Sequence, residues 1–176
     1  MDATLAAVAF ALMAPDDLAK EAVRVEARDP RVIALLEALT SELALSGYTP
    51  EQTFGYSIEQ LELTDVHLVG VPAPEGQLVG VAGIELQGKV GELKRFFVAP
   101  AHRGTGVADA LIAALIEFAV DRDVDVLRLE TGDKQMAAIA FYRRHGFAEI
   151  PRFGPYVDSE TSHCMERRLA RARDLD

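Results

Sequence analysis

The stretch APAHRGTGVADAL, residues 99–111, decides the fold assignment of this chain. It places Arg103 beside Gly104 and Gly106 and then turns apolar with a helical period. Backbone N–H groups at the start of a helix have no intrahelical partner, and the helix dipole is positive there. Glycine lets a ligand approach the backbone closely, and arginine is a donor suited to phosphate. The stretch therefore predicts an anion-binding site at the start of a helix.

Three phosphate-binding patterns are alternatives for this loop, beside a plain glycine-rich turn with an exposed arginine. A P-loop requires Gly-Lys-Ser/Thr after its glycines, and the chain lacks that sequence here. A dinucleotide fingerprint requires a third glycine, where this chain has Asp109. A pyrophosphate held by backbone amides, as in coenzyme A binding, fits the spacing of Arg103, Gly106 and Ala108. On these residues alone, the plain turn and the pyrophosphate site both stay open.

The rest of the chain divides into segments of strand-like and helical patterning. Alternating or continuous apolar residues between turn residues predict strands over 21–28, 66–73, 78–86, 90–98, 125–131, 147–150 and 163–169. Helical periodicity predicts helices over 29–47, 104–122 and 135–146, with an irregular stretch at 48–63 that holds one helical turn. We therefore expect a mixed α/β fold, a central, twisted and mostly antiparallel sheet flanked by helices. It would form a single domain over 21–176, after an N-terminal extension at 1–20.

The first and second predicted helices carry recognisable boundaries and faces. Asp29 can cap the first helix, Pro30 suits its first position, and Gly47 can end it. Its expected apolar stripe comprises Ile33, Leu36, Leu39, Leu43 and Ala44. The expected apolar face of the second helix comprises Val107, Ala108, Leu111, Ile112, Leu115, Ile116 and Ala119.

Charge and composition limit the partners of the chain. With 18 basic and 28 acidic residues, the net charge of its 176 residues is −10. Phosphate backbones and anionic bilayers attract basic surfaces, so we expect neither nucleic acid nor a membrane as a partner. The acidic surface favours a cationic amine, although Lys94, Arg95 and Arg152 suit a carboxylate equally well. The oligomeric state, a homodimer included, is open.

Cysteine usage and the N-terminus bear on location. Cys164 is the single cysteine, so the chain forms no internal disulfide, and a reducing, cytoplasmic location is expected. The sequence has no CxxC or His-rich cluster, so we expect no metal. The apolar run at residues 4–14 is too short to span a bilayer and follows no Lys or Arg. We expect it to lie outside the core fold rather than to act as a signal peptide.

Two segments together resemble one family. VAPAHRGTGVADALI resembles the acyl-CoA signature of the GNAT superfamily of N-acetyltransferases, written Q/R-x-x-G-x-G/A. QMAAIAFYRRHGF is similar to its N-x-x-A-x-x-F-Y-x-x-x-G-F segment, except that Gln135 stands where asparagine is frequent. The tail resembles that of small bacterial members with a Phe-Gly-x-Tyr loop before the last strand, some labelled indole-acetic-acid acetyltransferases. The resemblance covers residues 21–169 and implies the GNAT-like acyl-CoA N-acyltransferase fold.

The resemblance also implies where acetyl-CoA, the acyl donor, lies. In this superfamily, the strand before the signature loop separates from its neighbour, and its backbone pairs with the pantetheine arm. By position, these residues are Phe96, Phe97 and Val98. The pyrophosphate would lie on the amides of Arg103, Gly104, Thr105, Gly106, Val107 and Ala108. Gln135 would keep a coenzyme contact through a longer arm.

Acetyl transfer to an amine requires a neutral amine and protonation of the departing thiolate. The resemblance makes Tyr142 the general acid, while packing of its ring on the sheet is the alternative. We expect Glu92 to be the general base, because strand alternation puts Val90, Glu92, Lys94 and Phe96 on one face, opposite Leu93, Arg95 and Phe97. A plain Glu92–Lys94 pair is an equal alternative, and Glu130 is a second candidate.

The acceptor is expected to be the amine of a small molecule, attacked directly in a ternary complex. Phe153 and Tyr156 are expected to line its pocket, and the aromatic residues of 48–63 to form a pocket wall or a core edge. Cys164 has no activating neighbour in sequence that would make it an acyl carrier. Acetylation of a protein amine, a non-catalytic acyl-CoA-binding module and an unrelated nucleotide-binding domain are the alternatives.

Overall fold

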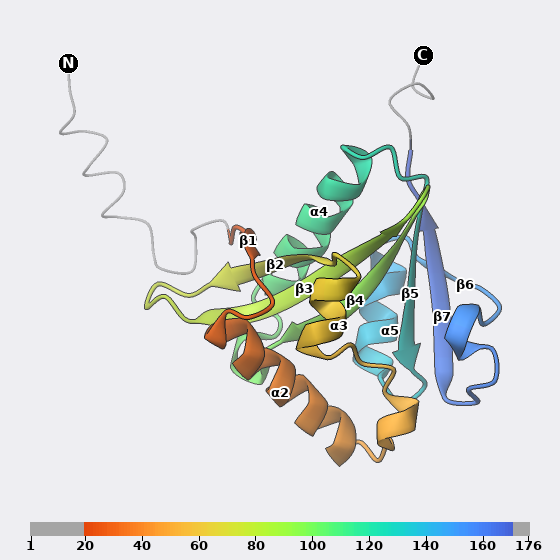
Figure 1. The fold of residues 1–176 in the computed structure, drawn as a ribbon, viewed down its shortest axis with the longest axis horizontal. Helices are drawn as coiled ribbons and strands as arrows, with labels where there is room; N and C mark the ends of the chain where they lie inside the picture. The colour runs from red at the N-terminus through yellow and green to blue at the C-terminus, as the bar shows by residue number, and fades with distance from the viewer. Residues whose placement is uncertain (1–19, 171–176) are drawn as a thin grey trace.

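The computed structural model describes residues 20–170, so the predicted extension at 1–20, apart from Lys20, and the end of the domain after residue 170 lie outside the described residues (Figure 1). The strands are β1 (Val23–Val25), β2 (His67–Pro72), β3 (Leu78–Gln87), β4 (Val90–Val98), β5 (Val126–Gly132), β6 (Ala148–Glu149) and β7 (Ser162–Arg168). The α-helices are α2 (Pro30–Leu45), α3 (Ile58–Leu63), α4 (Val107–Val120) and α5 (Met136–Arg144), with short 3₁₀ turns at Pro50–Gln52, Pro100–His102 and Gly154–Tyr156. Within this part of the chain, no helix is both long and apolar enough to cross a membrane.

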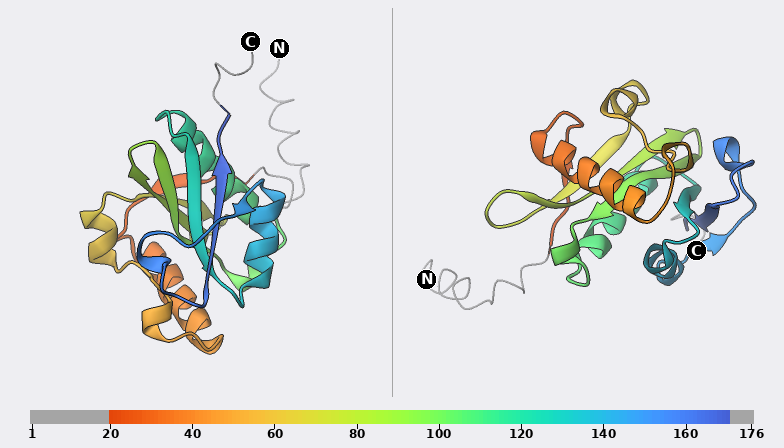
Figure 2. Two further views of the ribbon diagram at one scale, coloured as in Figure 1. Left: turned by 90° about the vertical axis from the view of Figure 1, so that its right-hand side faces the viewer. Right: turned by 90° about the horizontal axis from the view of Figure 1, so that it is seen from below.

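The described strands form one sheet in the order β1-β2-β3-β4-β5-β7-β6. Every neighbouring pair is antiparallel except β4 and β5, which run parallel. Helices α2 and α3 cover one face, and α4 and α5 cover the other (Figure 2). The predicted mixed, mostly antiparallel sheet flanked by helices is therefore confirmed.

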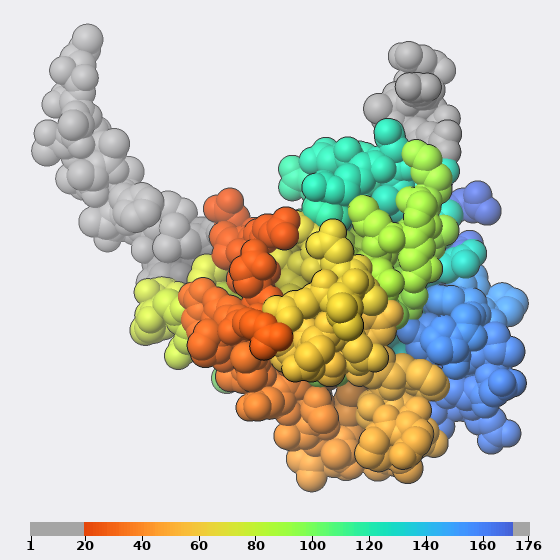
Figure 3. Space-filling model, viewed as in Figure 1, coloured from red at the N-terminus to blue at the C-terminus, as the bar shows by residue number. Residues whose placement is uncertain are grey.

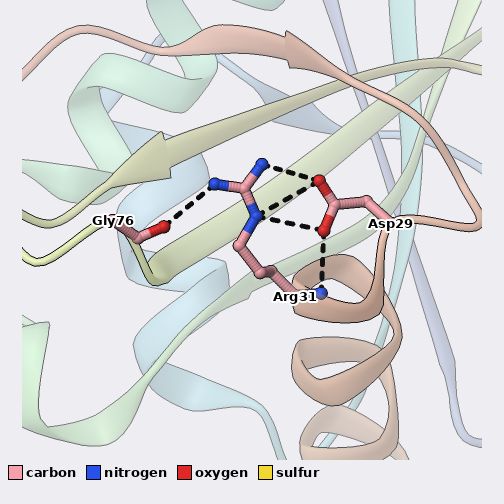
Figure 4. Close-up of polar contacts among 3 residues, drawn as sticks. All are labelled: Asp29, Arg31 and Gly76. Atoms are coloured by element: carbon pink, nitrogen blue, oxygen red, sulfur yellow. Dashed lines mark hydrogen bonds and ion pairs between the residues drawn. The ribbon is translucent and has the colours of Figure 1, made fainter.

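Helix α2 begins as its sequence predicts. The Asp29 carboxylate accepts a hydrogen bond from the Arg31 backbone N–H at 2.8 Å, and Pro30 takes the first turn. The Arg31 guanidinium also pairs with that carboxylate and donates to the Gly76 carbonyl at 2.9 Å (Figure 4). These contacts tie the start of α2 to the turn between β2 and β3. At the other end, Gly47 ends the helix with a φ of +83°, which an L side chain rarely adopts.

The apolar stripe predicted for α2 is partly wrong. Val32, Leu35 and Leu36 are the buried residues, while Ala44 is exposed and Ile33 is only partly buried. Both stripes have helical spacing, and sequence alone does not say which of two adjacent apolar rows faces the sheet. In α4 the predicted face is right. Its buried members are Val107, Leu111, Ile112, Leu115 and Ala119.

Helix α4 starts later than predicted, at Val107 rather than at residue 104. Gly104 and Gly106 have φ angles of +73° and +86°, which no right-handed helix contains. The helix then lies close to the sheet, because a Cβ at Gly80 would come within 2.6 Å of Val107 Cγ1. The glycines of the opening motif thus hold a sharp turn before a tightly packed helix.

A β-bulge changes the faces of β4. Gly83 pairs with Lys94 but Val81 pairs with Phe97, so one residue of β3 faces both Arg95 and Phe96. The predicted alternation is therefore wrong beyond Lys94. Phe96 leaves the face of Lys94 and packs against Tyr142 of α5, with the ring centroids 5.9 Å apart. Arg95, with a φ of +53°, turns toward α2 instead of following Leu93.

The parallel strands β4 and β5 separate after a short pairing. Residues 90–92 of β4 pair with 126–128 of β5, and no later residue of β4 has a partner on β5. Strand β5 pairs with β7 along its full length instead. The separation that the family resemblance implied is therefore present, and it opens the sheet at its middle.

Candidate active site

A cavity of about 140 Å³ lies at the opening between β4 and β5. Its walls come from α2, the connection between α2 and α3, both separated strands, α5 and the 3₁₀ turn before β7. Figure 3 shows the α2–α3 region against the C-terminal part of the chain on this side. Polar and aromatic residues on its walls include Tyr48, Phe54, Tyr56, Lys94, Arg95, Phe96, Glu130, Gln135, Tyr142 and Tyr156.

Glu92 is buried and fully engaged. Its Oε1 accepts hydrogen bonds from Lys94 Nζ and from the Tyr156 hydroxyl, both at 2.6 Å. The Lys94 ammonium also lies 4.5 Å from the centre of the Tyr56 ring. The Glu92–Lys94 pair that the sequence offered as an alternative is thus formed. Burial and the Glu92 carboxylate raise the pKa of Tyr156, so that hydroxyl stays protonated.

Glu130 is the second carboxylate at the opening and differs in its environment. One oxygen accepts a hydrogen bond from Ser162 Oγ at 2.7 Å, and Glu130 forms no ion pair with a residue in the described range. Burial, reinforced by the charge of Glu92, raises the pKa of Glu130 to about 7. A carboxyl group with that pKa exchanges a proton near neutral pH, as a general base must.

Tyr142 takes the packing role weighed from the sequence, and its role as general acid stays a prediction. Its ring packs in the core against Phe96 and Phe147, with centroids 5.9 and 5.6 Å away. Its hydroxyl makes no hydrogen bond to residues 20–170, and the residue lines the cavity. Burial, with the Glu130 charge, raises the pKa of Tyr142, so the phenol stays protonated at neutral pH.

The loop before α4 offers unpaired donors. Gly104 and Gly106 adopt left-handed backbone conformations, and the amides from Gly104 to Ala108 make no backbone hydrogen bond within the described chain. The Thr105 hydroxyl donates to the His102 carbonyl at 2.7 Å. With the helix dipole behind them, these amides can hold an anion.

Arg103 was expected to offer its backbone amide to the anion, but both its amide and its side chain have partners within the protein. Its backbone N–H donates to the Pro100 carbonyl at 3.3 Å, so its amide is occupied. Its Nε donates to the Val98 carbonyl at 3.0 Å, and its Nη2 pairs with Glu42 of α2 at 2.7 Å. The side chain therefore braces the loop against β4 and α2.

The other expected coenzyme residues are distributed along the opening. Phe97 is buried under α2 and Val98 under α4, so only their backbone is available on the separated edge, whereas the half-buried Phe96 packs against α5 and lines the cavity. Gln135 lies at the start of α5 and lines the cavity. Its side-chain amide has no hydrogen-bond partner among residues 20–170.

The two expected acceptor residues have different positions. Tyr156 lines the cavity, but Phe153 does not. The Phe153 ring packs edge-on behind Tyr156, with centroids 5.2 Å apart, and lies 5.5 Å from the Arg128 guanidinium. The expectation that Phe153 lines the pocket is therefore wrong, because its ring is taken up by these two neighbours.

Sequence reasoning missed Ser162, and it named Tyr48 and Arg95 without the contacts that bring them to the cavity. Tyr48 donates to the Asp133 carboxylate at 3.0 Å and accepts from the Lys134 backbone N–H at 2.7 Å, which closes one wall of the cavity. Ser162 lies 32 residues from Glu130 and becomes its partner through the β5–β7 pairing. Arg95 reaches the cavity through the bulge, for which the sequence gave no signal.

Comparison with known proteins supports a common family. The model of the acetyltransferase (GNAT) family matches residues 34–147. IAA acetyltransferase of Azospirillum brasilense is 34% identical over 140 residues, which cover 78% of this chain and 90% of that protein. An uncharacterised N-acetyltransferase of Escherichia coli K12, YedL, is 33% identical over 129 residues, 72% of this chain and 80% of that protein.

Solved structures agree. A Klebsiella pneumoniae protein assigned as an acyl-CoA N-acyltransferase has a TM-score of 0.71 at 34% identity, over 86% of this chain and 98% of that chain. PaiA N-acetyltransferase of Thermoplasma acidophilum, solved with coenzyme A, has a TM-score of 0.69 at 16% identity, over 85% of this chain and 98% of that chain. The second likeness shows the fold alone. Since the family model and both sequence relatives cover most of the chain, the chain belongs to the GNAT family of acetyltransferases, and it is an acyltransferase enzyme.

Proposed function

We propose that the protein transfers the acetyl group of acetyl-CoA to the amine of a small molecule, by direct attack in a ternary complex. One observation carries this proposal. The cavity at the opening between β4 and β5 is lined by Glu130 and Tyr142, and the chain runs on from β4 through a 3₁₀ turn into a loop of unpaired backbone amides. A proton acceptor on β5, a proton donor on α5 and an anion site in the loop before α4 are thus the three parts of this proposal.

In this proposal, the pyrophosphate of the coenzyme lies on the amides from Gly104 to Ala108. The backbone of 96–98 pairs with the pantetheine arm, which takes the place that a β5 partner would fill. Gln135, at the start of α5, contacts the same arm through its free amide. The Arg103 side chain, paired with Glu42, stabilises the loop rather than the phosphates.

Glu130 is proposed as the general base ahead of Glu92. Lys94 and Tyr156 both donate to Oε1 of Glu92, so this oxygen is already occupied within the protein. Glu130 has one neutral donor and a pKa of about 7, so it is ionised in part at neutral pH and can accept the amine proton, directly or through water.

The amine nitrogen then attacks the thioester carbonyl carbon, the C–N bond forms, and the C–S bond breaks. Tyr142 donates its phenolic proton to the departing sulfur. Unperturbed phenols and thiols have pKa values of about 10 and 8.5, so the thiolate is basic enough to share that proton. The raised pKa keeps Tyr142 in its protonated form before the reaction.

The size of the cavity favours a small acceptor. Its volume of about 140 Å³ accommodates an acetyl group and a compact amine. A protein amine would enter as an extended side chain, and we keep that as the second acceptor class. A cytoplasmic site of action is part of the proposal, in line with the single, unpaired and buried Cys164.

The first test is binding, followed by turnover. Acetyl-CoA should raise the melting temperature, while ATP and NAD should not. At a hundred times its dissociation constant, a ligand adds about 2.7 kcal/mol of stability. Release of coenzyme A should then require an amine, and Tyr142→Phe should lower kcat while the coenzyme still binds. Stabilisation by acetyl-CoA without release for any amine would favour the binding module, and competition by ATP or NAD would favour the nucleotide-binding domain.

A further inference from the structure

Arg95 occupies an unusual backbone position for its type. It lies in the β4 bulge with a φ of +53°, a region that non-glycine residues rarely enter. Such strain persists where the surrounding structure enforces it, and it is concentrated at functional sites. The bulge turns the Arg95 side chain toward α2 and onto the wall of the cavity.

The guanidinium of Arg95 has neutral partners only. Its Nη2 donates to the Leu36 carbonyl and to Thr40 Oγ1, both at 3.2 Å. Its Nε is buried and has no hydrogen-bond partner among residues 20–170. Burial lowers the pKa of Arg95, and no carboxylate of the described chain offsets that effect. A half-buried cation without a counter-charge is a costly arrangement unless a ligand supplies the charge.

Other cations near the cavity are already paired. Lys94 is neutralised by Glu92, and Arg103 is paired with Glu42. Arg152, which the sequence also offered as a carboxylate ligand, donates to the carbonyls of Ser162 and Glu160 and does not line the cavity. Of the three cations considered from the sequence, Arg95 therefore keeps an unmatched charge at the cavity.

The connection between α2 and α3 leaves space for this guanidinium at Gly55. A Cβ at Gly55 would come within 2.2 Å of Arg95 Nη1, so only glycine leaves room for the side chain in its observed position. Phe54 and Tyr56, on either side of Gly55, also line the cavity. The loop therefore holds Arg95 at the cavity wall.

We propose that Arg95 binds the carboxylate of the acceptor, so that the acceptor class is a small molecule with both an amine and a carboxylate group. This assignment rests on the proposed function, since it places the amine of the same molecule toward Glu130. Arg95 then binds the carboxylate and Glu130 accepts a proton from the amine, as in an amino acid or a similar amino carboxylate.

The test compares matched acceptors. Free amino acids and their carboxamides form pairs that differ only in the carboxylate, and coenzyme A release gives kcat/KM for each. A hydrogen bond to a charged group contributes enough to change rates by about 10- to 100-fold. We expect the wild type to prefer the acid by that factor for the best pair. Arg95→Gln should lose the preference, because its kcat/KM for the acid should fall by more than its kcat/KM for the carboxamide.

Further variants separate recognition from folding. Arg95→Lys should keep part of the preference, and Gly55→Ala should reduce it by displacing the guanidinium. Arg24→Gln, at an exposed arginine on β1, is the matched control and should leave the preference unchanged. A purely structural role for Arg95 would lower turnover of acid and amide equally. No preference in the wild type, or a preference unchanged in Arg95→Gln, would overturn the subsite.

Failure of the proposed function gives a different result. Calorimetric binding of each pair to the protein saturated with coenzyme A needs no turnover. One outcome is that no amine is acetylated, that the acid still binds more tightly than its amide, and that Arg95→Gln abolishes this difference in affinity. The proposed acetyl transfer then fails, while the proposed carboxylate subsite stands. If neither member of any pair binds or reacts, the amino-carboxylate class is wrong.

Discussion

Replacing Glu130 with glutamine should stabilise the protein while it removes the proposed general base. The pKa of Glu130 rises from 4.5 to about 7 on folding. The folded chain therefore holds the proton more tightly than the unfolded chain, and the resulting stability is present below pH 4.5 and lost as the pH rises to about 7. With about 1.4 kcal/mol per pKa unit, the penalty at pH 8 is on the order of 3 kcal/mol.

Glutamine is neutral at every pH and can still accept the hydrogen bond from Ser162, so the variant avoids this penalty. For a protein of this size, the melting temperature at pH 8 should rise by roughly 6 to 12 °C. At pH 4 the two proteins should melt alike. Thermal melts over pH 4–9 measure the difference, with Glu117→Gln on the exposed face of α4 as the control.

Activity should move in the opposite direction. In the wild type, kcat/KM should fall about tenfold for each pH unit below about 7, because protonated Glu130 accepts no proton. The glutamine variant should lose about 10²- to 10⁴-fold and should lack this acidic limb. The same melting curve for both proteins at every pH would refute the burial argument, and an acidic limb that persists near pH 7 in the variant would assign it to another group.

Two other substitutions test the surrounding framework. Lys94→Met leaves the buried Glu92 carboxylate without its cation and should lower the free energy of unfolding by about 3–5 kcal/mol. Urea unfolding measures this loss, and an unchanged free energy of unfolding would contradict it. Gly106→Ala places a Cβ at a φ of +86° and should lower the free energy of unfolding by about 1 kcal/mol. It should also weaken acetyl-CoA binding, which calorimetry measures. The control Gly76→Ala, at a φ of +88°, should lower the stability by a similar amount and leave acetyl-CoA binding unchanged.

The sequence predicts this fold well where the signals are local. Turn residues bound β4, and the prediction of 90–98 agrees with Val90–Val98. Asp29, Pro30 and Gly47 bound α2 for reasons that act within one helical turn. The glycines of the opening motif predicted the turn before α4, although their positive φ angles delay the helix to Val107.

Long-range contacts explain what the sequence could not predict. The bulge at Arg95 depends on the register with β3, so simple alternation put Phe96 on the wrong face. Glu92 forms a hydrogen bond with Tyr156, 64 residues away, and Arg103 pairs with Glu42, 61 residues away. Patterns within a strand or helix contain no information about such partners. The hydrogen bond of Glu130 with Ser162 and the ion pair of Arg103 with Glu42 therefore could not be predicted from the sequence.

Helix α2 is bound to both halves of the opening. Its Glu42 pairs with Arg103 of the loop before α4, the proposed coenzyme site, and its Leu36 carbonyl and Thr40 hydroxyl accept from Arg95 at the proposed acceptor subsite. Both arginines therefore have side-chain contacts with the same helix. If acetyl-CoA changes the affinity for the amine substrate by some factor, thermodynamic reciprocity requires that the amine substrate change the affinity for acetyl-CoA by the same factor. We therefore expect any coupling between coenzyme binding and acceptor binding to pass through α2 and its Glu42–Arg103 ion pair.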